Sequence, residues 1–266
     1  MPPQAVLHPE GDPLSSKDAV KPGTTWNLDN PSTLVKARLG YSKLSDARRE
    51  EVDETLWRID EALYSTRSRV EYAIYHHFEA DRLQRLRKRR IQRSASPEKT
   101  KMMYQVEHPE DRIASEANIV ACLQNAHAVF DLFMFGAYYA LFVGRSAPLL
   151  EPRGVTWRNV EPLLSKQPKL ATLRSQMKGL RANADFKYLD ALVNSSKHRA
   201  VIKTKHYIVI DYAIDEESAP RFDEFEFNGQ RHARREALPF TRSVCNLMGK
   251  FTVEAGQELD VALSAL

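Results

Sequence analysis

The chain has 266 residues, of which 42% are hydrophobic and 28% charged, with a net charge of +4. This balance is typical of a globular protein with a real core, and the mildly basic charge by itself assigns no partner. The two cysteines are too few for a disulfide framework or a cysteine zinc site, so a reducing cytoplasm is the expected compartment.

Residues 1–41 predict an N-terminal arm, extended or disordered, ahead of one large domain over residues 42–266. The arm is rich in Pro, Ser, Asp and Gly and shows no sustained periodicity, and Trp26 is its only large anchor. Its first residues, "MPPQAVLHPEGDP", have neither a basic stretch nor an apolar run. A secretory signal is therefore not expected.

A long amphipathic helix is predicted from Ser45, which is a suitable N-cap with acidic residues shortly after it. No Gly or Pro interrupts the pattern before Pro97. The inward positions alternate at spacings of four and three, as the buried face of a helix requires. They are Val52, Leu56, Ile59, Leu63, Thr66, Val70, Ala73 and His77.

A second helix is predicted from Asp111 to about Val143. It is apolar nearly all round, which favours a central position in a bundle. Its most apolar run, residues 128–144, is short for a membrane span and carries Asp131, so we interpret it as a core helix and expect no membrane. Cys122 lies in an apolar part of the same predicted helix, before this run, and is expected to be a buried, reduced thiol.

Shorter helical patterns follow as far as residue 201, and the period then changes from 3.6 to 2. The alternating segments predict a β-hairpin at about 205–229, and the last residues predict a closing helix. The expected fold is mainly α, a helical bundle of four to five helices with a small β-hairpin inserted before the C-terminal helix.

One candidate site lies in "LDALVNSSKHRAV" (189–201). At about 100° per residue, Asp190, Asn194, Lys197 and His198 fall in one arc beside the apolar stripe, and Arg199 follows directly. Cationic side chains in a last turn can simply cap the helix and complement its dipole. Asn194 favours a site, because asparagine is a poor helix former and gains most from a specific hydrogen bond.

A second polar ridge is formed by Gln124, His127 and Asp131 in the apolar helix. A buried carboxylate there needs a partner, and His127 is one turn away. Such a pair can orient an imidazole for proton transfer, or it can be purely structural. If this ridge faces Asn194 across the bundle, the two sets form one polar pocket.

A central helix with "NAHAVFD", a later helix ending in "NSSKHR", and then a hairpin and a final helix resemble HEPN-like bacterial proteins. The resemblance covers roughly residue 45 to the end. It implies a helical bundle, commonly a homodimer, that cleaves RNA or binds a nucleotide at a cleft between helices. It also implies a toxin–antitoxin or phage-defence setting, with an antitoxin or other protein partner.

Active members of that superfamily carry an arginine and a histidine separated by four to six residues. Two pairs fit, Arg69 with His76 and Arg199 with His206. Chance alone accounts for two such pairs in a chain with this many arginines and histidines. The count therefore assigns no site, and the second pair also crosses from a helix into a strand.

A dense basic run, "RLQRLRKRRIQR", closes the first long helix. Cations spread around a helix suit contact with phosphates without readout of bases, although a merely solvated helix end has the same composition. The candidate nucleic-acid-binding residues are Arg82, Arg85, Arg87, Lys88, Arg89, Arg90 and Arg93.

Three hypotheses follow for the function. The first is a metal-independent endoribonuclease without cofactor, in which His198 or His127 moves the proton, Lys197 and Arg199 hold the phosphate, and Asp131 orients the histidine. The second is a non-catalytic module that binds RNA, a nucleotide or a protein through the same cleft, with Asn194 among its polar groups. The third is a structural bundle whose polar ridges satisfy each other.

Overall fold

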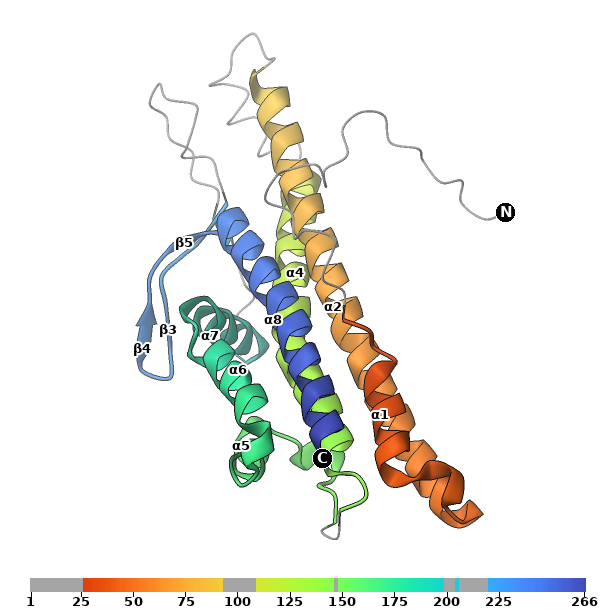
Figure 1. Cartoon of the computed structure of the whole chain (residues 1–266). Helices are drawn as coiled ribbons and strands as arrows, with labels where there is room; N and C mark the ends of the chain where they lie inside the picture. The colour runs from red at the N-terminus through yellow and green to blue at the C-terminus, as the bar shows by residue number, and fades with distance from the viewer. Residues whose placement is uncertain (1–25, 93–108, 146–147, 199–203, 206–219) are drawn as a thin grey trace, which may run out of the picture.

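The computed structural model describes residues 26–92, 109–145, 148–198, 204–205 and 220–266 (Figure 1). Within these residues the chain forms seven α-helices and two very small β-sheets. The prediction of a mainly α bundle with a hairpin before its last helix is confirmed.

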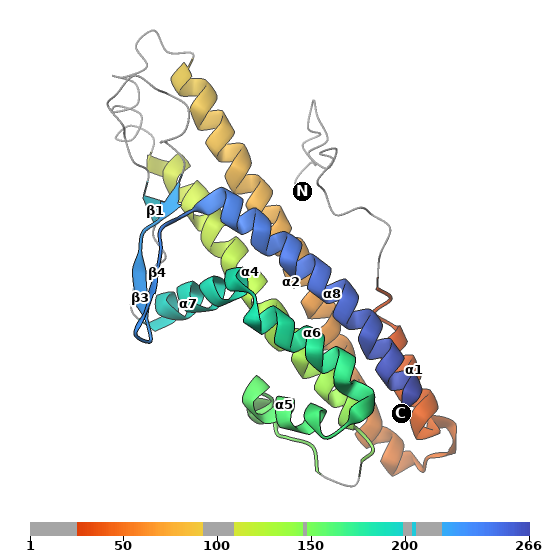
Figure 2. The same cartoon turned by 60° about the vertical axis from the view of Figure 1, so that its left-hand side comes forward.

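Three long helices, shown side by side in Figures 1 and 2, form the centre of the fold. They are α2 (Asp46–Gln92), α4 (Pro109–Phe142) and α8 (Ala237–Ala265). All eight positions of the stripe predicted for α2 are buried. The sequence period therefore correctly identified the face of α2 that packs on α4 and α8.

The apolar helix α4 is the central helix of the core. Its mean hydropathy of 1.4 and its length would allow a membrane span, but 61% of that window is buried inside the protein. Phe133 packs edge-to-face against Phe251 of α8, and Phe130 packs against the same ring at a tilt. Both phenylalanines of α4 are almost inaccessible to solvent. The same core contains Cys122 and Cys245, whose free thiols lie 3.6 Å apart. The interpretation of α4 as a core helix fits this packing.

Residues 30–39 differ from the expected extended or disordered arm, because they form helix α1 (Asn30–Leu39). Pro31 stands in its first turn, where no amide hydrogen is needed, and Gly40 ends it in the left-handed conformation with φ 59°. Trp26 is the predicted anchor, buried against α8. The sequence pattern did not predict this helix because its inward positions are too few for a period to appear. The rest of the predicted arm, residues 1–25, lies outside the described residues.

A second layer crosses α4 and α8 on the side away from α2 (Figure 2). Two single turns belong to it: η3 (Pro152–Gly154) precedes its first helix, and η4 (Pro168–Leu170) joins its first two helices. The helices are α5 (Trp157–Ser165), α6 (Ala171–Ala182) and α7 (Ala184–His198).

The strands lie directly before α8. Hairpin β3 (Phe225–Phe227) and β4 (Gln230–His232) is closed by Asn228 and Gly229, whose φ values of 50° and 75° fit a tight two-residue turn. An antiparallel sheet has the strand order β1 (Thr204–Lys205), β2 (Arg221–Phe222), β5 (Arg235–Glu236). The described hairpin starts later than the predicted 205–229, and residues 206–219 of that range lie outside the described residues.

Candidate functional site

His127 on α4 and two residues of α7 form one hydrogen-bonded cluster. The His127 ring nitrogen Nε2 lies 3.0 Å from Oδ1 of Asp190, and Nδ2 of Asn194 donates to the same oxygen at 2.9 Å. The imidazole is only 9% exposed. The two polar ridges expected from the sequence thus meet across the bundle at these residues.

The cluster stabilises the ionised form of Asp190. The hydrogen bond from His127 is the largest influence and lowers the pKa of Asp190 below its ordinary value, with smaller support from Arg181 and Asn194. An ionised carboxylate only accepts hydrogen bonds, so Nε2 of His127 carries the hydrogen. The carboxylate therefore fixes the orientation of the ring, as a proton-transferring histidine or a structural pair would require.

The expected pairing of His127 with Asp131 is wrong. Asp131 is exposed, as is Gln124, and the partner of His127 comes from α7 instead. The physical reason is the packing of α7 against α4, which supplies a carboxylate to the buried imidazole from across the interface. Asp131, one turn further along α4, points into a separate groove.

The remaining residues of the predicted cluster are only partly described. Helix α7 extends to His198, so Lys197 and His198 continue the helix that carries Asn194. Their side chains, and all of Arg199 and His206, lie outside the described residues.

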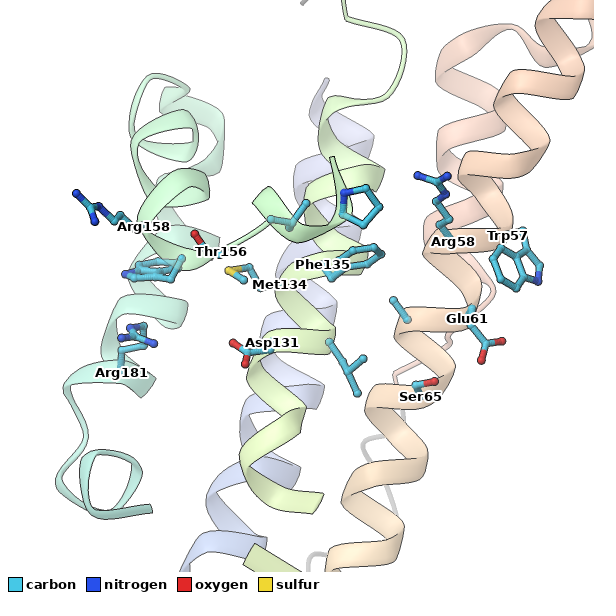
Figure 3. A pocket seen from close by; sticks show the side chains of 15 residues that line it. Trp57, Arg58, Glu61, Ser65, Asp131, Met134, Phe135, Thr156, Arg158 and Arg181 are labelled. Carbon is cyan, nitrogen blue, oxygen red and sulfur yellow. The ribbon is translucent and has the colours of Figure 1, made fainter. Parts of the chain in front are cut away.

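An open groove of about 790 Å³ lies between α2, α4 and the start of α5. Figure 3 shows Arg58 on the α2 wall, Asp131 on α4, and Arg158 and Arg181 on the opposite wall. Two further residues from its lining, Met134 of α4 and Trp157 of α5, add apolar surface. The groove thus has cations on both sides, one carboxylate and an apolar part.

Two of these arginines are held in place by aromatic rings. The Arg58 guanidinium lies 5.8 Å from the centre of the Tyr139 ring, and its hydrogen bond with Glu54 raises its pKa further. The Arg181 guanidinium lies 5.5 Å from the centre of the Phe130 ring and lowers the pKa of Asp190. Arg181 therefore connects the groove electrostatically to the His127–Asp190–Asn194 cluster.

Arg69 and His76, the pair with nuclease-like spacing, are seated by two asparagines of α4. Arg69 Nη1 donates to Asn125 Oδ1 at 2.8 Å, and His76 Nδ1 lies 2.8 Å from Asn118 Oδ1. Both pairs are seven residues apart on their helices, and α2 and α4 run antiparallel, so the two contacts repeat two turns apart. The arginine and the histidine thus share one edge of α2 beside α4.

The hydrogen bonds also assign the tautomer of His76. The amide nitrogen of Asn118 donates to the Ala114 carbonyl at 2.8 Å, which leaves its Oδ1 as the atom facing the ring. Nδ1 of His76 is therefore the donor, and Nε2 of the neutral ring carries the lone pair. A lone pair at Nε2 is what a general base needs.

No protein-family model, curated protein or solved structure matches the chain. The geometry above therefore carries the argument about function.

The basic run at the end of α2 is less available than its composition suggests. Arg82 pairs with Glu79, Arg85 with Asp81 at 2.6 Å, and Arg90 with Asp111 at 2.7 Å, while Arg87 is buried. Lys88 and Arg89 are exposed, and Arg93 lies outside the described residues. These ion pairs reduce the positive potential that phosphates would meet.

Sequence reasoning missed most of the groove. Arg58, Trp157 and Arg181 come from three different helices, and no spacing along the chain relates them. Among the described residues, no group of three His, Cys, Asp or Glu side chains is placed to hold a metal ion. For the contacts of Arg69 and His76 with α4, the sequence contained one usable signal. Asn118 and Asn125 have the same seven-residue spacing as Arg69 and His76.

Proposed function

We propose that this chain is a HEPN-like bundle that binds RNA or a nucleotide in the groove between α2, α4 and α5. The observation that carries the proposal is the placement of Arg58 and Arg181 on facing walls, with Asp131 between them. Guanidinium groups are the side chains best suited to phosphate oxygens, because their planar forks donate two parallel hydrogen bonds.

The remaining lining suits the other parts of a nucleotide. Trp157 is half-buried and offers an aromatic surface to a base, and the Asp131 carboxylate can accept from a ribose hydroxyl or an exocyclic amine. The volume of about 790 Å³ is within the range of small-ligand sites. Single-stranded RNA can enter the same groove by one terminal nucleotide, since the groove is open.

Calorimetric titration with AMP and with a short 5′-phosphorylated RNA tests the binding. Arg58→Ala and Arg181→Ala should each weaken binding by roughly 10-fold or more, the value of one charge-assisted hydrogen bond. Arg67→Ala is the matched control, because Arg67 is exposed on α2 and only pairs with Glu71. Equal affinities in all three variants, or no binding of either ligand by the wild type, would contradict the proposal.

RNA cleavage is a second candidate function, favoured by the seating of Arg69 and His76. Arg69 can hold a phosphate while Nε2 of His76 takes a proton from a ribose hydroxyl, and this chemistry needs no metal ion. His127, oriented by Asp190, is the alternative proton-transfer group, and Lys197 with His198 is the set expected from the sequence.

Cleavage of varied RNAs with and without EDTA separates these possibilities. We expect EDTA-resistant cleavage that His76→Ala lowers by about 100-fold or more, as the removal of a general base does. His127→Ala and the double variant Lys197→Ala/His198→Ala should retain most activity if α2 carries the chemistry. Loss of cleavage in one of those variants alone would move the assignment to that residue set.

A further inference from the structure

The outer face of α2 displays an unusual number of uncovered aromatic side chains. Trp57, Tyr64, Tyr72 and Tyr75 are 64%, 64%, 54% and 62% exposed, and they include most of the large exposed hydrophobic side chains among the described residues. At about 100° per residue they fall within an arc of roughly 80°, on a stretch about 27 Å long. We call this surface the outer band. Such aromatic residues are enriched at protein interfaces.

Within the part of the chain that the structure describes, neighbouring elements leave the four aromatic side chains of the outer band more than half exposed. Helix α1 and η2 (Tyr41–Lys43) contact α2 on the adjacent face, through Ser32 with Asp60 and Tyr41 with Asp53. Trp57 and Glu61 also belong to the α2 wall of the groove (Figure 3), whereas Tyr64, Tyr72 and Tyr75 are not among its lining residues. The band thus borders the proposed ligand site at Trp57, and its other three aromatic side chains lie outside that site.

The charge of α2 reverses along its length. Residues 46–61 contain seven carboxylates and three arginines, whereas residues 82–90 contain five arginines, one lysine and no carboxylate. A polyanion such as RNA would be repelled by the acidic half of this face. A second α2 in antiparallel orientation instead places each acidic half on a basic half, and a parallel orientation brings like charges together.

A single antiparallel register also matches the exposed side chains. Glu50, Trp57 and Tyr64 are seven residues apart, as are Tyr75, Arg82 and Arg89, and the spacing of seven keeps each set on one face. When Tyr64 of one copy faces Tyr75 of the other, Trp57 faces Arg82 and Glu50 faces Arg89. The centre then pairs aromatic rings, the next position stacks a guanidinium on an indole, and the ends form ion pairs.

We propose that the outer band of α2 binds the outer band of a second copy of this chain, with the two helices antiparallel and related by a two-fold axis. Each contact then occurs twice, once on either side of the axis. At each end of the interface, the acidic half of one α2 faces the basic half of the other, and this charge pairing fixes the register. Trp57 is shared with the groove, whereas the central contacts of Tyr64 with Tyr75 lie outside it.

Sedimentation velocity over a series of protein concentrations tests the interface. The wild type is expected to dimerise, and Tyr64→Ser/Tyr75→Ser should weaken the dimer by about 100-fold because it removes its central aromatic contacts. Both side chains are exposed, so folding should be preserved, which circular dichroism checks. Arg181→Ala, a groove variant, should dimerise like the wild type.

A charge exchange tests the orientation. Glu50→Arg and Arg89→Glu should each weaken the dimer by about 10-fold, since each creates two like-charge contacts. The double variant Glu50→Arg/Arg89→Glu should recover to within about threefold of the wild type, because the exchanged charges face each other again. A double variant as weak as the single variants would overturn the antiparallel register.

Two other results would overturn the proposal altogether. One is a wild type that sediments as a monomer at every concentration. The other is a Tyr64→Ser/Tyr75→Ser variant with unchanged self-association and lost binding of single-stranded RNA, which would assign the band to nucleic acid. Failure of groove ligands to bind would leave the sedimentation results unaffected, so the two proposals fail separately.

Discussion

Gly256→Ala is expected to lower the free energy of unfolding by about 1–3 kcal/mol, the usual cost of forcing a methyl group into a filled core. In an exposed helix the same change stabilises, since glycine costs up to about 1 kcal/mol relative to alanine. At position 256 a Cβ would overlap the indole ring of Trp26. That ring is fixed by edge contact with Phe133 and by a 3.0 Å hydrogen bond from Nε1 to Asp260, so it has little freedom to move away.

Denaturant unfolding measures the change as a shift of the midpoint at constant slope. Gly179→Ala is the matched control, because Gly179 lies within α6 with nothing near its missing Cβ, and there we expect stabilisation by about 0.5–1 kcal/mol. In a Trp26→Ala background the Gly256→Ala change should cost much less, since the clashing ring is gone. Equal effects of Gly256→Ala with and without the ring would show that Trp26 does not pack there.

The parts of the fold that the sequence predicts are those set by local period and turn chemistry. The buried stripe of α2, from Val52 to His77, follows from spacings of three and four alone. The turn at Asn228 and Gly229 follows from two residues that tolerate positive φ. Both signals lie within one element, so a single sequence contains them.

The candidate site depends on contacts between distant elements, and these were predicted only in part. The polar character of His127 and Asn194 was visible, because polar side chains beside an apolar stripe need partners. The partner of His127 was not visible, since Asp190 is 63 residues away along the chain and Asp131 is only four residues away. Only packing of α7 on α4 decides between the two carboxylates.

Arg38 is a second example of a contact that no spacing reveals, and it caps the central helix. Its guanidinium extends from α1 to the last turn of α4, where Nη2 donates to the carbonyls of Ala140 at 2.9 Å and Val143 at 3.0 Å. Nη1 donates to Leu141 at 3.4 Å. The last carbonyls of a helix have no partner within it, and a cation there also complements the helix dipole. Burial lowers the pKa of Arg38, with a further contribution from Arg145.

Arg38→Ala is therefore expected to lower the free energy of unfolding by about 2–4 kcal/mol, since it removes charge-assisted bonds and leaves partly buried carbonyls unpaired. Arg38→Lys should lose an intermediate amount, because a single ammonium cannot place forked donors on several carbonyls. Arg48→Ala, which only breaks an exposed ion pair with Glu51, should change stability by no more than about 0.5 kcal/mol. An equally small change for Arg38→Ala and Arg48→Ala in denaturant unfolding would contradict this role. It would mean that water caps the end of α4 as well as the guanidinium does, and Arg38→Lys and Arg38→Ala would then have the same stability.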